Sequence, residues 1–251
     1  DVYKRQRSKR FVTNIKIYVL EKFMLRKIIS LGAPSAMQMF FEIAIFTAAI
    51  WLSGLLGKNP QAANQIALNL SSMTFMIAMG LGVAAMVRVG NQKGLLKFIE
   101  LRRIAISIFL FAVIFAAGFA VLFLIFRFQL PRLYVDLTDP DNLIDTMEVV
   151  SIASQLLLIA AIFQISDSIQ VVVLGALRGL QDVNIPTLIT FISYWIIGFP
   201  ISFFLGKEDV FGSVGIWIGL LAGLSSASIL LYLRFNYLTL KLIKTKKNGF
   251  T

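Results

Sequence analysis

The sequence predicts an all-α, polytopic membrane protein whose helices form a six-helix bundle. Apolar residues make up 58% of the 251 positions and only 15% of the residues are charged, and the mean hydropathy is +0.81. A soluble domain of this length has too little core volume for so many apolar side chains. Several uncharged runs reach about 18 residues, enough to cross the hydrocarbon core as a helix. The alternating pattern of a membrane β-barrel is missing.

The clearest membrane span is 104–126, which contains no charged residue between Arg103 and Arg127. Segments rich in Gly, Pro and charged residues separate the predicted spans, as expected for the loops between helices. The other five spans are predicted at 31–56, 63–87, 150–177, 185–205 and 214–233.

The net charge of +11 is distributed unevenly across these spans. If the N-terminus is cytoplasmic, 20 of the 24 Lys and Arg residues lie on the cytoplasmic side, and only Lys58, Arg127, Arg132 and Lys207 lie opposite. Short cytoplasmic loops of membrane proteins carry this excess of basic residues. We therefore expect a multi-pass protein of the cell (inner or plasma) membrane with both termini in the cytoplasm. The positive charge indicates attraction to anionic membrane lipid and no nucleic-acid partner.

The predicted domain organisation has three parts. Residues 1–30 form a cytoplasmic segment, in which 1–6 (DVYKRQ) resemble a translated sequencing adapter. The rest of this segment is predicted to be a linker helix between two bundles, with a surface amphipathic helix as the alternative. Residues 31–238 form the six-span unit, and 239–251 form a basic cytoplasmic tail.

The chain contains no cysteine and no histidine. Thiolate and imidazole metal sites, cysteine nucleophiles and the usual general base are therefore excluded. No paired-aspartate motif for prenyl diphosphate chemistry is present either. We expect neither an enzyme nor a protein with an organic cofactor.

Only two charged residues lie well inside a predicted span, Glu42 in the first and Asp167 in the fourth. They lie 11 and 10 residues from the cytoplasmic ends of their spans. At about 1.5 Å per residue both are roughly 15–17 Å deep, which is the middle of a hydrocarbon core of about 30 Å. An acid at this depth costs about 2.5–3.5 kcal/mol to insert, so it usually faces a cavity or pathway.

Two carboxylates at one depth can form a single site. Desolvation and mutual repulsion disfavour the state in which both are ionised. Such a pair binds a proton, collects oxygen ligands around Na⁺, or is neutralised by an organic cation. Competition among these ligands gives a physical basis for antiport. The alternative is that neighbouring polar side chains hold each acid for packing alone.

Polar and aromatic residues near the two acids are candidates for lining a substrate cavity. An aromatic ring in this position offers its face to a cation, whereas polar side chains in spans also connect helices. The candidates are Gln38, Phe46, Asn69, Met73, Phe163, Gln164 and Gln170. Close helix approach is expected at Gly80, Gly82, Gly215, Gly219 and Gly223.

Five stretches, in this order, resemble the C-terminal half of the multidrug and toxin extrusion (MATE) family. They are LGAPSAMQMFFE at 31–42, QIALNLSSMTFMIAMGLGVAAMVRVGNQKG at 65–94, LPRLY at 130–134, DSIQVVVLGALRGLQDVNIPTLITFISYWIIGFP at 167–200 and, more weakly, GSVGIWIGLLAGLSSASILLYLRF at 212–235. The resemblance covers about residues 25 to 240.

The resemblance implies one lobe of a twelve-helix antiporter, with the N-terminal lobe of the same protein as its missing partner. Such a transporter exports small cationic, amphipathic drugs or metabolites in exchange for Na⁺ or H⁺. Glu42 and Asp167 match the acidic positions that bind the coupling cation in the NorM-like branch. Phe163 stands where that branch can carry a tyrosine, so the hydroxyl is lost from the cation's ligand set.

Two other functions remain as alternatives. A lipid-linked oligosaccharide flippase of a related fold would need a strongly basic cavity for phosphate, and the sequence places no Lys or Arg deep in any span. A membrane scaffold without transport activity is the second alternative.

Overall fold

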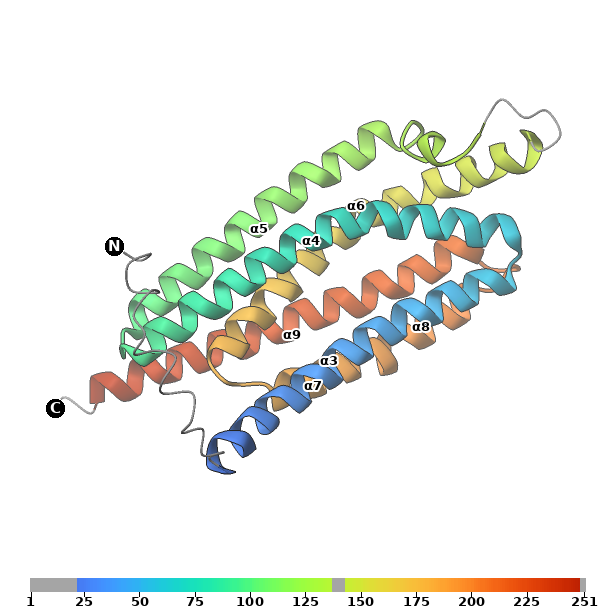
Figure 1. The fold of residues 1–251 in the computed structure, drawn as a ribbon. Helices are drawn as coiled ribbons and strands as arrows, with labels where there is room; N and C mark the ends of the chain where they lie inside the picture. Colours follow the sequence, from blue (N-terminus) through green and yellow to red (C-terminus); the bar gives the residue numbers. More distant parts are fainter. Residues whose placement is uncertain (1–21, 137–142, 249–251) are drawn as a thin grey trace, which may run out of the picture.

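The computed structural model describes residues 22–136 and 143–248. Within these residues, six helical segments are long and apolar enough to cross a membrane, which confirms the predicted six-helix, all-α bundle (Figure 1). The helices are α3 (Lys22–Leu55), α4 (Lys58–Gly94), α5 (Phe98–Phe126), α6 (Leu143–Gly179), the composite helix Asn184–Leu205 and α9 (Gly212–Asn248).

Most helices extend beyond the predicted spans. Helix α3 begins at Lys22, so 22–30 continue directly into the first span, and α9 runs to Asn248, well past residue 233. Apolarity identifies only the part of a helix that suits hydrocarbon, whereas backbone hydrogen bonds continue into water. The adapter-like residues 1–6 and most of the predicted linker lie outside the described residues.

Helix α6 is the central element of the bundle and contacts α4, α5 and α9. Its buried residues include Leu156, Leu157 and Leu177. Small residues let its neighbours approach, as predicted for Gly82 of α4, which contacts the α6 backbone. Gly215, Gly219 and Gly223 of α9 also make close contacts, whereas the prediction for Gly80 is wrong, because open space surrounds it.

The fifth span is one continuous helix of three parts. It comprises α7 (Asn184–Phe191), a π-helical segment η3 (Ile192–Gly198) and α8 (Phe199–Leu205). The wide turns of η3 immediately precede Pro200, whose ring nitrogen cannot donate the next helical hydrogen bond. The π-helical segment carries Tyr194, which is fully buried.

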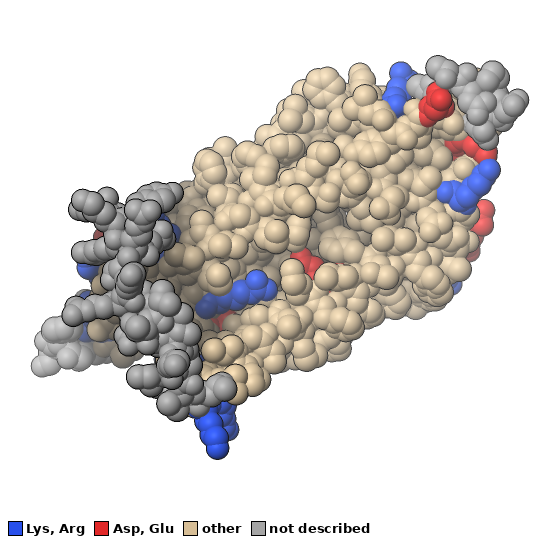
Figure 2. Space-filling view, in the orientation of Figure 1, with Lys and Arg blue, Asp and Glu red and all other residues tan. Residues whose placement is uncertain are grey.

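On the face that Figure 2 shows, most charged side chains lie at the two ends of the bundle, and the surface between them is uncharged except for one basic group and a small acidic group in a hollow near the middle. We call one end the basic end; it carries Lys93, Arg102, Arg178 and Arg234. The opposite, acidic end carries Asp145, Glu148, Glu208 and Asp209. The first turn of α3 and the last turn of α9 both lie at the basic end (Figure 1).

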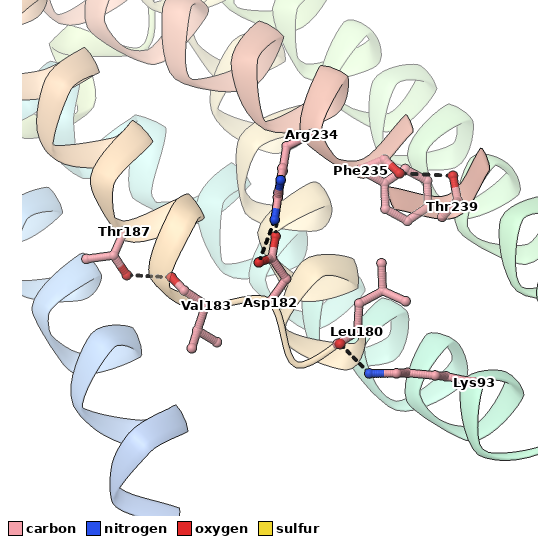
Figure 3. A network of polar contacts seen from close by, with 8 residues as sticks. All are labelled: Lys93, Leu180, Asp182, Val183, Thr187, Arg234, Phe235 and Thr239. Carbon is pink, nitrogen blue, oxygen red and sulfur yellow. Dashed lines mark hydrogen bonds and ion pairs between the residues drawn. The ribbon is translucent and has the colours of Figure 1, made fainter. Parts of the chain in front are cut away.

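Two basic side chains fasten the loop between α6 and α7 at the basic end (Figure 3). Nζ of Lys93 in α4 donates to the backbone oxygen of Leu180. Arg234 of α9 pairs with Asp182 through Nε at 2.8 Å and NH2 at 3.1 Å. The end of α6 is thus held from two sides.

Candidate functional site

Glu42 and Asp167 line the same cavity, which has a volume of about 300 Å³ and lies between α3, α4 and α6. Asp167 is only 4% exposed, and the two acids interact electrostatically. Oε1 of Glu42 and Oδ1 of Asp167 are both buried and have no hydrogen-bond partner. Two carboxylate oxygens are therefore available to a proton or a cation. Another cavity, of about 530 Å³, lies at the acidic end and includes neither acid.

Aromatic rings form much of the remaining cavity wall. Phe46 of α3 and Phe163 of α6 both line it, with their ring centroids 6.0 Å apart. Behind them, Phe163 packs on Trp217 of α9 at 5.4 Å. Trp217 is fully buried, and its Nε1 donates a 2.9 Å hydrogen bond to Asn64 of α4. A cation beside the acids would therefore also meet aromatic rings.

The two glutamines that flank Asp167 lie behind the cavity and do not line it. Gln164 is buried, and its Oε1 accepts a 2.9 Å hydrogen bond from Thr74 of α4. Gln170 is fully buried. Tyr194 of η3 is near enough to interact electrostatically with both acids, and its hydroxyl lies beside the side chain of Gln170. Sequence reasoning did not identify Tyr194, because nothing in its spacing relates it to another helix.

Asn69 and Met73 are not among the residues that line the cavity of the two acids. Met73 is 56% exposed, and Asn69 accepts a 3.0 Å hydrogen bond from the hydroxyl of Tyr134. Helical periodicity correctly groups these two residues on one face of α4, but it does not show which face turns toward α6. Ser71 and Ser72 line the cavity instead.

Gln38 connects three helices one turn before Glu42. It is 2% exposed; its Nε2 donates to Thr190 at 3.1 Å, and its Oε1 accepts from NH2 of Arg178 at 2.8 Å. Arg178 also interacts electrostatically with Glu42.

Arg178 lies in the last turn of α6, at the basic end, and its side chain turns toward Gln38 of α3. The sequence predicts that the fourth span ends at residue 177 and that Arg178 lies in a loop, but α6 continues to Gly179, so Arg178 remains on the helix. Arg178 follows Asp167 by 11 residues, about three helical turns, which puts both on one face. That spacing was the signal available in the sequence.

The arrangement gives an acidic cavity with aromatic walls and one nearby arginine. None of the cavity-lining residues is Lys or Arg, so the cavity suits a cation better than the phosphate that a flippase would bind. Among the described residues, no group of three or more His, Cys, Asp or Glu could hold a metal ion. A Na⁺ ion here would need oxygen ligands beyond the two carboxylates, such as hydroxyl groups or water.

Comparisons with known proteins agree with this architecture. The MdtK multidrug resistance protein of Proteus mirabilis is 37% identical over 233 residues, 91% of this chain and 49% of that protein. The NorM multidrug resistance protein of Aliivibrio fischeri is 40% identical over 217 residues, 84% of this chain and 45% of that protein. This chain thus spans about half the length of the curated relatives it matches.

Solved structures show the same fold at lower identity. The Vibrio cholerae MATE transporter VcmN in the bent form superposes with a TM-score of 0.79 at 15% identity, over 96% of this chain and 53% of that one. A family model described as MatE matches residues 34–204, which is more than half of the chain. The chain therefore belongs to the MATE family of membrane transporters.

Proposed function

We propose that this chain forms one six-helix lobe of a secondary antiporter that exports cationic, amphipathic compounds in exchange for Na⁺ or H⁺. Glu42 and Asp167 bind the coupling cation in this proposal. The observation that carries it is that these two acids, from different helices, line one cavity and each present an unpartnered oxygen.

Competition at this cavity couples the two fluxes. Two carboxylates in a low-dielectric site repel one another unless a positive charge is bound between them. A proton, Na⁺ or an organic cation can each supply that charge, so binding of one weakens binding of another. The rings of Phe46 and Phe163 favour a flat organic cation. An inward cation gradient then drives the organic cation out.

The partner of this lobe is a second lobe of the same protein. The relatives are about twice as long as this chain, and α3 and α4 present exposed apolar side chains, including Phe40, Met73 and Met76. Residues 31–238 are the six-span unit in this proposal. The basic end faces the cytoplasm of a bacterial cell and contacts anionic lipid, because basic residues concentrate there.

The test uses Glu42→Gln and Asp167→Asn in the gene that encodes this chain, expressed in cells that lack their own drug pumps. Each variant removes one negative charge with little change in shape. Ethidium efflux should be lost in both, with and without an imposed Na⁺ or proton gradient. Glu100→Gln is the matched control, since Glu100 is an exposed acid in the first turn of α5 and its loss should leave efflux intact. Normal efflux by both cavity variants, at normal membrane levels, would refute the proposal.

A further inference from the structure

We propose that Arg178 is a positioning residue that competes with the coupling cation at Glu42, and that its fixed charge drives cation release toward the basic end. This inference rests on the proposed function, because it assigns a device for release to the same site. When the cation leaves, the guanidinium supplies the positive charge that the carboxylate has lost.

The position of the Arg178 side chain is defined by its hydrogen bond. Its NH2 donates to Oε1 of Gln38 at 2.8 Å, and Gln38 is one turn from Glu42 on α3. Gln38 is itself fixed, because its Nε2 donates to Thr190. The guanidinium is thus held on the side of Glu42 that faces the basic end.

Two cavities meet at Met39, between Arg178 and the acids. A cavity of about 470 Å³ is lined by Arg178 and Met86 together with Met39. Met39 also lines the cavity that contains Glu42 and Asp167. A cation that moves from the acids toward the basic end therefore passes Met39 and then Arg178.

The unsatisfied groups on both sides suit an exchange of partners. Arg178 Nε is buried without a hydrogen-bond partner, and so is Oε1 of Glu42. The two groups interact electrostatically, but no ion pair joins them among the described residues. A guanidinium out of water is costly unless a negative charge compensates it. Glu42 can compensate the charge of Arg178 or that of a bound cation, so each of these positive charges weakens the interaction of the other with Glu42.

The backbone after Arg178 is fastened, so the charge stays near the site. Leu180 is bound by Lys93, and Asp182 is bound by Arg234 (Figure 3). On the next helix, the Thr187 hydroxyl makes 2.8 and 2.9 Å hydrogen bonds to the backbone oxygens of Val183 and Pro34. These contacts tie the loop after α6 to α4 and α9, and they tie α7 to α3.

The test measures cation affinity in the purified protein that contains this chain, with tryptophan fluorescence as the signal and Na⁺ as the probe. Arg178→Gln should lower the half-saturating Na⁺ concentration at least about fivefold, because a competing charge near a buried carboxylate is worth about 1 kcal/mol or more. With protons as the probe, the same change appears as half-saturation at a higher pH. A purely structural role for Arg178 predicts the opposite sign, because a loosened site binds more weakly.

Two further variants isolate the effect of charge. Arg178→Lys keeps the positive charge and loses the guanidinium geometry, so its half-saturation should stay near that of the unmodified protein. Arg88→Gln removes a charge from an exposed side chain of α4 near the basic end and should change nothing. Unchanged or weaker binding in Arg178→Gln, or an equal shift in Arg178→Lys, overturns the inference. If Arg178→Gln does not fold, Arg178→Met, which also removes the charge, takes its place in the same measurement.

The outcomes also separate this inference from the proposed function. If Glu42→Gln and Asp167→Asn abolish cation binding while Arg178→Gln behaves like Arg88→Gln, only the role of Arg178 fails. If the two acid variants bind cations and export ethidium normally, the proposed function itself fails.

Discussion

Gly175 of α6 faces Gly82 of α4 with no room for a side chain between them. A β-carbon placed on Gly175 would overlap the carbonyl oxygen of Gly82. The same backbone contact recurs one turn further along, where a β-carbon on Gly179 would lie 3.1 Å from the backbone nitrogen of Gly90. This contact sets the separation of α4 and α6, which both contribute walls to the cavity of Glu42 and Asp167.

We therefore expect Gly175→Ala to destabilise the protein by about 1–3 kcal/mol, because the helices must separate to admit a methyl group. The effect is measured by thermal unfolding in detergent, with gel filtration as the readout of the protein that remains folded after heating. Gly118→Ala is the control: no atom lies within 4 Å of the added methyl group, and alanine favours a helix by up to about 1 kcal/mol. Equal stability of the two variants would show that the α4–α6 contact tolerates a wider spacing.

The pair of Arg234 and Asp182 is expected to stabilise the basic end. Its side chains are 26% and 17% exposed, and two hydrogen bonds join them. Arg234→Gln should cost about 1–2 kcal/mol, because Asp182 loses both charge-assisted bonds. Arg234→Lys should restore only part of this, since lysine lacks the planar fork.

Arg103→Gln serves as the control for this prediction. Arg103 pairs with Glu100 at 3.3 Å, but its side chain is 72% exposed, and exposed ion pairs contribute little. The melting temperature should fall for Arg234→Gln and stay constant for Arg103→Gln. A fall of equal size in both would indicate a general effect of charge at this end.

Hydropathy identified all six helices because the apolar composition of a span is a local property. Depth placed Glu42 and Asp167 at one level because the rise per residue of a helix is nearly constant. Their common cavity depends also on the rotation of α3 and α6, which spacing alone does not give. Spacing does not give the rotation of α4 either, so it could not show that Asn69 and Met73 would not line this cavity. The sequence predicts Arg178 in a loop because a charged residue after an apolar run is read as the end of the span, whereas the helix continues past it.

Phe163→Tyr is expected to strengthen Na⁺ binding. The ring of Phe163 lines the cavity beside both acids, and a hydroxyl there adds an oxygen ligand of the kind that hard cations prefer. The half-saturating Na⁺ concentration should fall severalfold while the pH of half-saturation by protons changes little. Phe75→Tyr, in the α4 wall of the same cavity, is the comparison. Weaker Na⁺ binding in Phe163→Tyr would place the ion away from this ring.

The hydrogen bond between Trp217 and Asn64 is expected to hold the aromatic wall in place. Both residues are fully buried, and the donor–acceptor distance is 2.9 Å. Asn64→Ala leaves the indole N–H unpaired and should cost about 1–3 kcal/mol. Combining it with Trp217→Phe should cost less than the sum of the two single changes, because that N–H is then absent. Additive losses in a double-mutant cycle would mean that the bond contributes nothing.

Water access to the cavity can be tested with a thiol, since these 251 residues contain no cysteine. Met39 is 51% exposed and lines both the acidic cavity and the cavity of Arg178. Met39→Cys should react with a positively charged methanethiosulfonate reagent. Ile45→Cys, at a position only 2% exposed, should react at least about tenfold more slowly, because the reactive thiolate needs water. Na⁺ at saturating concentration should slow the Met39→Cys reaction, since a bound cation repels the positive reagent. Equal rates at the two positions would mean that the route past Met39 is closed to water, and a cation could not then leave the acids in the direction of Arg178.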